Sequence, residues 1–357
     1  MTVDMTADSG TLPDGLDAYF AERAEAVDRG TADVLDGLRR LADHGLLAHP
    51  DLAVSCAVIE RVARHCLASA FSTWAHTMVA EYLSLSSSAV LRAEVPRLRR
   101  AERIGSTAMA PAMQHLVGLA DLGVGFRQHG GALVVDGAVR WASNLFAEGF
   151  LVVVGAADPD GKRAVLAIAS DAPGVHAGAP LDLLALGATH SSSLRFEQVR
   201  LDPTFVVSTD FGPYLRTVKP RFLLLQSSFC LGLARGALES AEVSLERSFA
   251  SFRIEHDHLR AHLDTLSARH QQLIGELAPT QVLVTHRLEV AKMAQQAVDV
   301  ELRVAGGRGY RASSPTARRV REAAFLPIQS PTEGHLRFEL DSFVPGEVPV
   351  PVVGGDR

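Results

Sequence analysis

The sequence predicts a mainly helical protein with a β-domain in its middle. Long segments with apolar residues at helical spacing fill the first hundred or so residues and return after about residue 207. Between them, runs rich in β-branched residues alternate with turn signals such as Asp-Gly. We therefore expect an N-terminal helical domain over 1–103, a middle antiparallel β-domain of barrel or sandwich type over 104–206, a C-terminal four-helix bundle over 207–345, and a loose tail over 346–357.

Two segments carry the N-terminal helical prediction. DAYFAERAEAVDRGTADVLDGLRRLADHGLL and CAVIERVARHCLASAFSTWAHTMVAEYLSL both place apolar residues on one helical face. Gly45, near the end of the first segment, and Pro50, just beyond it, mark the boundary, because both residue types interrupt helices. The first zone is therefore expected to be several helices rather than one.

Three strand signals define the middle zone. In ALVVDGAVRWAS, the Asp136-Gly137 pair lies between two apolar runs, which predicts a hairpin turn. FLVVVGAADPDGKRAVLAIAS has a Pro-Asp-Gly turn at 159–161 and predicts a second hairpin. The segment RFEQVRL is a further strand candidate. Together they indicate antiparallel pairing.

The third zone contains long helical patterns. RFLLLQSSFCLGLARGALESAEVSLERSFASF is apolar at helical spacing, and one or two more helices follow it. Pro279 is expected to break or kink that second stretch, because proline lacks a backbone N–H. Long antiparallel helices of this kind are typical of a bundle.

Composition excludes several classes of protein. The formal net charge of −6 over 357 residues gives no reason to expect nucleic acid as a partner. The three cysteines, Cys56, Cys66 and Cys230, form no CxxC motif, which argues against zinc and suits a reducing cytosol. The N-terminus lacks the features of a signal peptide, and no apolar run reaches membrane-spanning length. We expect a cytoplasmic protein without membrane contact.

Four local motifs, in order along the chain, resemble the acyl-CoA dehydrogenase superfamily of flavoproteins. They are VDGAVRWASN, TVKPRFLLLQSSFCLGLARGALESA, SLERSF and VAGGRGYRASSPTARRVREA. The resemblance covers most of the chain and implies the family's three-part fold and an FAD cofactor. It also implies a homodimer or homotetramer, because in this family a neighbouring chain covers the dinucleotide end of FAD.

The resemblance implies flavin contacts at the end of the VDGAVRWASN segment. A flavin ring needs a flat apolar wall and hydrogen bonds at its edge, and Trp141, Ser143 and Asn144 match the family's contact positions. Trp141 could instead be a core tryptophan. Ser106 and Thr107, in GSTAMAPA, fall where the family has a flavin and substrate loop, although its acidic and glycine-rich part is missing. A plain strand-to-loop turn is the alternative there.

The resemblance places the dinucleotide end of FAD at the glycine-rich turn GGRGY. Glycine allows close backbone approach, and arginine suits phosphate through its planar fork. A helix end followed by a turn is the structural alternative for the same glycines. The residues implied in this role are Gly306, Gly307, Gly309 and Tyr310, with Arg247 and Phe249 contributed by a neighbouring chain.

The catalytic base of the family has no clear counterpart here. In most members a glutamate lies nine residues beyond the arginine that matches Arg321, and this chain has Ser330 there. Glu333 serves as the base only if the loop has gained three residues, and His335 would then lie close by. Alternatively, Glu333 is a solvated residue in a polar turn that begins at Ser330 or Thr332.

Three functions follow from the resemblance. The first is an FAD-dependent oxidoreductase that acts on an acyl thioester or a related small molecule. The second is a flavin monooxygenase that uses reduced flavin and O2 and needs no α-proton base. The third is a non-catalytic homologue that serves as a partner subunit. A flavin reductase or an electron-transfer protein is a possible partner.

Two further patterns are interpreted without a ligand. His258 and His262 are spaced to share one helix face, as metal-binding pairs do, but no third ligand completes a known pattern. A solvated helix face is the preferred interpretation, and no metal is expected. The arginines of RAEVPRLRRAER are interpreted as a charged helix end.

Overall fold

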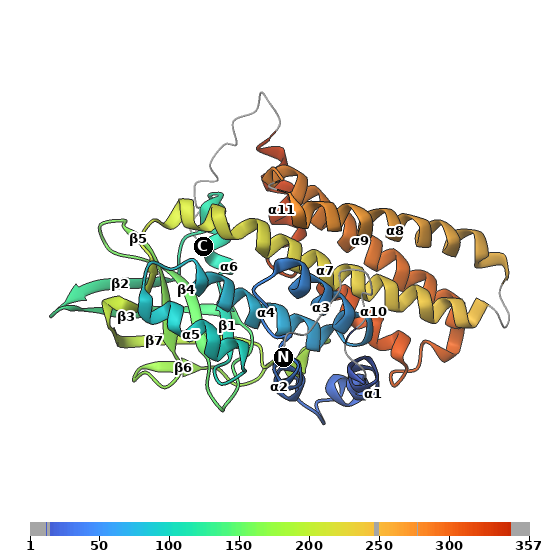
Figure 1. Ribbon diagram of the computed structural model, residues 1–357, viewed down its shortest axis with the longest axis horizontal. Helices are drawn as coiled ribbons and strands as arrows, with labels where there is room; N and C mark the ends of the chain where they lie inside the picture. The colour runs from blue at the N-terminus through green and yellow to red at the C-terminus, as the bar shows by residue number, and fades with distance from the viewer. Residues whose placement is uncertain (1–11, 13–14, 246–249, 277, 344–357) are drawn as a thin grey trace, which may run out of the picture.

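The computed structural model describes residues 12, 15–245, 250–276 and 278–343. Helices form one end of the molecule and the sheet forms the other, and the long α7 runs between the two (Figure 1). The N-terminal helices are α1 (Leu16–Asp28), α2 (Leu35–Asp43), α3 (Leu52–His65), α4 (Leu67–Ser84) and α5 (Ala89–Arg99).

Helix α4 is the central element of this region. Every residue from Leu67 to Leu83 is buried, so the helix is enclosed on all sides. It is separated from α3 by a single extended residue, Cys66. Side-chain caps begin the helices on either side, with Asp51 at α3 and Ser88 at α5. The helices around α4 therefore pack onto it as a shared core.

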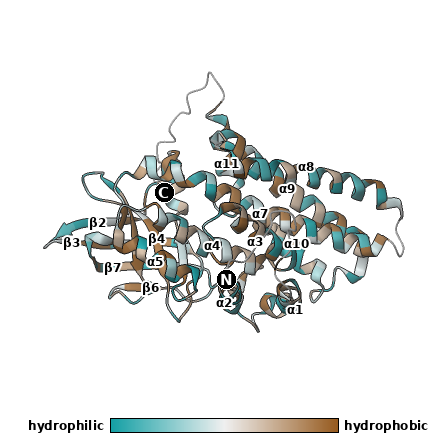
Figure 2. Ribbon diagram, viewed as in Figure 1, coloured by the Kyte–Doolittle hydropathy of each residue, from teal (hydrophilic) through white to brown (hydrophobic). Residues whose placement is uncertain are grey.

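One mixed sheet follows, and Figure 2 shows hydrophobic residues along its strands. Its order is β6-β7-β3-β2-β4-β5-β8, with β1 paired to β4. The elements are β1 (Gly105–Ala108), α6 (Ala110–Leu116), β2 (Val124–His129), β3 (Ala132–Ala142), β4 (Leu151–Ala157), β5 (Arg163–Ala169), β6 (Val175–Ala177), η1 (Gly187–Thr189), β7 (Ser192–Leu201), η2 (Pro203–Phe205) and β8 (Val206–Ser208).

The sequence predicts a purely antiparallel sheet, and this prediction is wrong in part, because two strand pairs are parallel. Strands β1 and β2 both run parallel to β4, at its beginning and its end respectively. Helix α6 connects β1 to β2, and this crossover allows both strands to pair with β4 in the same direction. The Pro-Asp-Gly turn does join the antiparallel pair β4 and β5, as predicted, with Gly161 at φ 82°.

The predicted hairpin at Asp136-Gly137 is wrong. These residues lie inside the continuous strand β3, and the β2–β3 hairpin turns at Gly130-Gly131 instead. Gly137 marks a register shift in the pairing with β7 and has φ 122°. A Cβ at Gly137 would approach the carbonyl oxygen of Gly123 to 2.3 Å. Here glycine serves a bulge with close backbone approach rather than a turn.

Helices return after the sheet. They are α7 (Phe211–Leu245), η3 (Ala250–Phe252), α8 (Arg253–Gly275), α9 (Thr280–Ala305), η4 (Gly306–Arg308), α10 (Pro315–Phe325) and α11 (Glu333–Asp341). The predicted break at Pro279 is confirmed, because this residue precedes the first turn of α9. No helix in the described part of the chain is long and apolar enough to cross a bilayer.

Helix α7 packs directly against the backbone of α3. A Cβ at Gly232 would lie 2.0 Å from the Glu60 carbonyl oxygen, and one at Gly236 would lie 2.2 Å from that of Arg64. Glycines one turn apart therefore allow the two helices to approach more closely than side chains permit. This contact joins the N-terminal helices to the C-terminal bundle.

His76 joins α4 to the first strand. Its Nδ1 accepts a hydrogen bond from the Gly105 N–H at 3.0 Å, and its Nε2 lies 3.0 Å from the Leu98 carbonyl oxygen. Only a neutral ring with the proton on Nε2 satisfies both groups. Burial lowers the pKa of His76 from 6.5 to about 4, which keeps the ring neutral.

We expect acid to weaken the fold through His76. The unfolded chain takes up a proton below about pH 6.5 and the folded chain does not, so stability falls as the pH drops from 6.5 towards 4. At about pH 5 the free energy of unfolding should have lost roughly 2 kcal/mol of the contribution of His76. Urea unfolding of the wild type and of His76→Gln at about pH 7.5 and about pH 5 measures this loss. The difference in free energy of unfolding between the two proteins should be smaller at the lower pH by roughly 2 kcal/mol.

The exposed His129 supplies the matched control. His129→Gln should keep the pH dependence of the wild type. An unchanged difference between His76→Gln and wild type across the two pH values would contradict the role assigned to His76.

Candidate functional site

A chain of hydroxyl groups surrounds the end of β3. The Ser143 Oγ lies 2.8 Å from the Ser191 Oγ, which in turn lies 2.8 Å from the Thr189 Oγ1. The Ser106 hydroxyl donates to the Ser143 carbonyl oxygen at 2.6 Å. The structure thus brings Ser106 and Ser143 together, although 37 positions separate them in the sequence.

Asn144 fixes three elements at this point. Its Oδ1 accepts from the Ser72 hydroxyl at 2.6 Å, and its Nδ2 donates to the carbonyl oxygens of Ser72 and Gly105 at 2.9 and 3.0 Å. The residue is fully buried and has φ 63°, a left-handed conformation that asparagine tolerates better than most residues. One side chain therefore ties β3 to α4 and β1.

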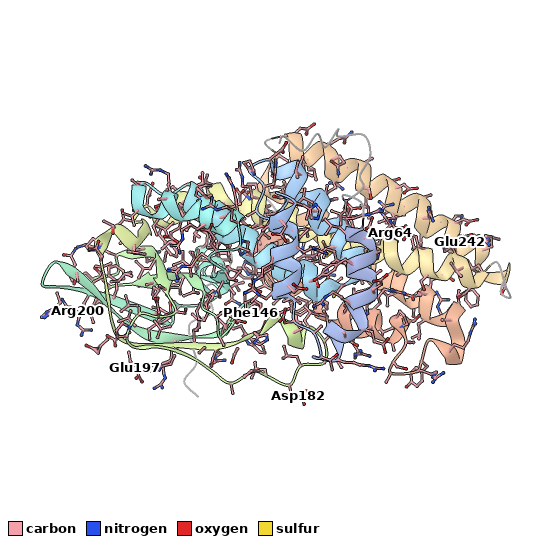
Figure 3. The ribbon with its side chains drawn as sticks, turned by 60° about the horizontal axis from the view of Figure 1, so that its bottom comes forward. Arg64, Phe146, Asp182, Glu197, Arg200 and Glu242 are labelled. Carbon is pink, nitrogen blue, oxygen red and sulfur yellow. The ribbon has the colours of Figure 1, made fainter. Side chains whose placement is uncertain are left out.

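Trp141 is exposed beside this network. Its exposed fraction is 56%, so the core-tryptophan alternative does not apply. The next residue, Ala142, pairs with Ser192, which lines a hollow of about 570 Å³ together with Phe146 and His190. Figure 3 shows Phe146 where the sheet meets the helices. The flat apolar ring of Trp141 therefore belongs to the end of β3. The next residue, Ala142, is the partner of Ser192 at the border of the hollow.

Thr107 faces a different neighbour from Ser106. Its Oγ1 lies 3.5 Å from the hydroxyl of Tyr82 on α4. The Tyr214 hydroxyl on α7 donates to the Tyr82 carbonyl oxygen at 2.8 Å. Because neighbouring strand residues point to opposite faces, Thr107 belongs to the helix side of β1.

An aromatic cluster continues from Ser72 into the bundle. Phe71 and Trp74 on α4 stack at 5.2 Å, and both make edge contacts with Phe229 on α7. The Trp74 Nε1 is buried without a hydrogen-bond partner. Phe222 and Phe325 complete the cluster. This cluster connects the β3 end to the elements that hold Ser330.

Ser330 is held by two amide side chains. The Nε2 atoms of Gln226 and Gln329 each donate to its carbonyl oxygen at 2.8 Å. Its own hydroxyl is buried and has no partner. The α10–α11 loop is therefore fixed by its backbone, and a hydroxyl remains available where the family resemblance expects a carboxylate.

Glu333 is the first residue of α11 and carries a helix-surface ion pair. Its Oε1 accepts from the Arg337 Nη2 at 2.7 Å, one helical turn away, and its side chain is 40% exposed. Thr332 caps the helix by accepting from the His335 N–H. A carboxylate in the first turn of a helix also interacts favourably with the helix dipole. These contacts match the helix-cap alternative for this segment.

His335 faces the interior, in contrast to Glu333. It is buried, and neither ring nitrogen has a partner. Burial and the nearby Lys219 lower its pKa to about 4, so the ring is neutral. Lys219 on α7 is buried as well and pairs with Glu339, which lies one turn beyond His335.

The glycine-rich turn lies on the surface of the chain. Gly306 has φ 57° and ends α9, and Tyr310 is 82% exposed. No hydrogen bond among the described residues links this turn to the Ser143 network. A Cβ at Gly309 would lie 2.6 Å from that of Ala305, so this glycine permits local packing. Arg247 and Phe249 lie outside the described residues.

Of the three histidines near the start of α8, it is His256, and not the predicted pair His258 and His262, that contacts acidic side chains. His258 and His262 are exposed on α8. His256 is buried instead, and its Nδ1 lies 3.3 and 3.2 Å from carboxylate oxygens of Glu242 and Asp257. Glu242 also pairs with Arg253. The contacts are those of a compact ion-pair cluster at the α7–α8 end of the bundle.

Sequence reasoning missed Gln226, Gln329 and Arg287. Arg287 on α9 is buried and donates to both amide oxygens, at 3.4 and 3.0 Å. Gln226 and Arg287 lie within helices and Gln329 lies in the α10–α11 loop, positions where a polar side chain usually faces solvent, and no motif marks them. Their position at Ser330 depends on how α7, α9 and the α10–α11 loop pack.

Known structures share this fold. A glutaryl-CoA dehydrogenase from Mycobacterium smegmatis in complex with FADH2 matches with TM-score 0.82 and 15% identity over 93% of each chain. The prolyl acyl carrier protein oxidase AnaB matches with TM-score 0.80 and 15% identity over 92% of this chain and 97% of its own. An acyl-CoA dehydrogenase from Geobacillus kaustophilus matches with TM-score 0.76 and 16% identity over 91% and 96%.

The chain therefore has the acyl-CoA dehydrogenase fold, as the sequence resemblance predicts. No family model matches the sequence. At these identities the likeness establishes the architecture, and the activity is a separate question.

We expect Asn144→Ala to destabilise the protein by about 3 kcal/mol. The change leaves a buried hydroxyl and a buried carbonyl oxygen without partners, and it places alanine in a left-handed conformation. Ser191→Ala removes only hydroxyl contacts and should cost about 1 kcal/mol. Urea unfolding of both variants measures the difference, and equal costs would contradict the joining role of Asn144.

Proposed function

We propose that the chain is an FAD-dependent oxidoreductase that acts on an acyl thioester or a related small molecule. The observation that carries this proposal is the end of β3, where the exposed Trp141 lies two residues before Ser143. The Ser143 hydroxyl contacts that of Ser191, whose neighbours His190 and Ser192 line the hollow. The shared fold supports it, because solved proteins of this architecture include one described in complex with FADH2.

The residues present fit a flavin. A ring system of this kind needs one flat apolar wall, which Trp141 offers, and polar groups at its edge, for which the hydroxyls of Ser143 and Ser191 are suited. Thr189 is fully buried and donates to the Leu186 carbonyl oxygen, so it would hold Ser191 in place. Ser106 and Asn144 would hold these groups in place rather than contact the cofactor. When bound, the flavin supplies hydride acceptance or, in reduced form, reaction with O2. The chain supplies orientation and exclusion of water.

A second candidate function is favoured by the α10–α11 loop. Glu333 is engaged by Arg337 on the helix surface, and Ser330 presents a hydroxyl rather than a carboxylate. Abstraction of an α-proton needs a base within hydrogen-bond reach of the substrate. These contacts favour a flavin monooxygenase that uses reduced flavin and O2, since that reaction requires no such base.

The proposal includes partners. A second copy of the chain would bring Arg247 and Phe249 to the dinucleotide end of FAD, near Gly306, Gly307, Gly309 and Tyr310 of the first. The glycine-rich turn supports this arrangement, because Tyr310 is exposed and no side chain of the described residues lies within 4 Å of a Cβ built at Gly306 or Gly307. A monooxygenase would also need a flavin reductase, and a dehydrogenase an electron acceptor.

We expect the purified protein to retain a visible flavin absorbance band after FAD addition and desalting. Trp141→Ala should weaken FAD binding at least about tenfold, because an aromatic contact is lost. Trp74→Phe removes an indole that lies in the aromatic cluster instead, and this variant should bind FAD as the wild type does. A colourless wild-type protein that takes up neither FAD nor reduced flavin would favour a non-catalytic partner subunit.

Glu333→Gln separates the two reactions. If the enzyme is a dehydrogenase with Glu333 as base, anaerobic bleaching of the flavin by acyl-CoA should fall by at least about a hundredfold in the variant. If it is a monooxygenase, acyl-CoA should not bleach the flavin, and a reductase should drive O2 consumption equally in both proteins. Full bleaching by the variant would exclude Glu333 as the base.

A further inference from the structure

Arg287 is the most deeply buried arginine among the described residues. It lies in the middle of α9 with an exposed fraction of 1%. Its Cζ lies 5.8 Å from the centre of the Phe229 ring, which belongs to the aromatic cluster. The side chain therefore lies between the aromatic cluster and the α10–α11 loop, where it also contacts Gln329.

The charge of Arg287 has no carboxylate partner within the described residues. The other buried cations of that part of the chain are all paired, Arg318 with Glu322, Arg319 with Glu301 and Lys219 with Glu339. Arg287 reaches only neutral oxygens, and one of its three hydrogen bonds is shorter than 3.4 Å. A buried guanidinium in this condition is costly, because the charge has lost water and gained no counter-charge.

Two further buried donors lie around the same residues. The Trp74 Nε1 has no partner, and its ring contacts Phe229 at 6.3 Å. The Ser330 Oγ has no partner, and the carbonyl of Ser330 is held by the two glutamines that Arg287 also binds. A cation and two unpartnered groups able to donate hydrogen bonds share one set of neighbours. Such a set is suited to a ligand that brings negatively charged oxygen atoms.

We propose that Arg287 binds a carboxylate on the substrate, so that the enzyme acts on acyl groups that carry an acid at the far end from the thioester. This inference rests on the proposed function for the thioester and adds the class of acyl group. Arginine suits the task because its planar fork matches both carboxylate oxygens. Gln226 and Gln329 act as positioning residues, since their amide oxygens orient the guanidinium and their amide nitrogens hold the loop.

The first test compares the stability of two arginine variants without ligand. Arg319→Met breaks a buried ion pair and should lower the urea midpoint clearly. Arg287→Met removes an unpaired buried charge, so its midpoint should equal or exceed that of the wild type. If Arg287→Met is destabilised as much as Arg319→Met, the role of Arg287 is to stabilise the α10–α11 loop, and the proposal is overturned.

The second test measures binding of two thioesters of equal length. Succinyl and butyryl N-acetylcysteamine differ chiefly in the terminal carboxylate, and calorimetry gives both dissociation constants without turnover. We expect the wild type to prefer the succinyl compound at least about tenfold. Arg287→Met should lose this preference, and Arg287→Lys should keep part of it.

The remaining outcomes distinguish the possible sources of the anion. If acetate and chloride bind as tightly as the succinyl thioester, the site takes free anions only and the proposal fails. A preference that persists in Arg287→Met places the carboxylate elsewhere and also overturns it. FAD uptake is measured separately, so a colourless protein that still prefers the succinyl thioester contradicts the proposed redox function and supports this inference.

Discussion

The structure depends on the hydrogen bonds that Asn144 makes with α4 and β1. A polar side chain at this depth is stable only if all its groups are paired, and the Ser72 hydroxyl and two carbonyl oxygens pair them. These bonds set where the sheet meets the helices. Trp141, Ser143 and the hollow beside them all take their position from that junction. The site is therefore a property of the contact between the two halves of the chain.

Much of the architecture could be predicted from the sequence, because periodic patterns report burial directly. The helical zones, the turn at Gly161 and the break at Pro279 all follow from local rules. The Asp136-Gly137 prediction failed because glycine serves a bulge as readily as a turn, and only the partner strand decides between them. The parallel pairs on β4 depend on α6, whose short pattern carries no information about which strands it connects.

Motifs mark only part of the candidate site. The motifs assign Ser106, Ser143 and Asn144 to contacts with one flavin, and the structure places the three residues at one point. Their contact with a flavin stays a prediction. Arg287 was not identified, because the significance of a buried charge lies in the absence of a counter-charge around it, which no sequence pattern records. Glu333 and His335 show the same limit. They are two residues apart, yet one lies at the helix surface with Arg337 and the other is buried beside Lys219.

The close contact of Gly232 and Gly236 with α3 limits how the helices around the aromatic cluster can move apart. Helices that touch through their backbones have no side chains between them to compress, so we expect α3 and α7 to move as one rigid unit. Helix α4 is joined to α3 by a single residue and shares this restraint. Any opening of the space between α4 and α7 must then come from rotation of side chains. Phe71 and Trp74 fill that space, and under the proposed function their rotation would admit the acyl group.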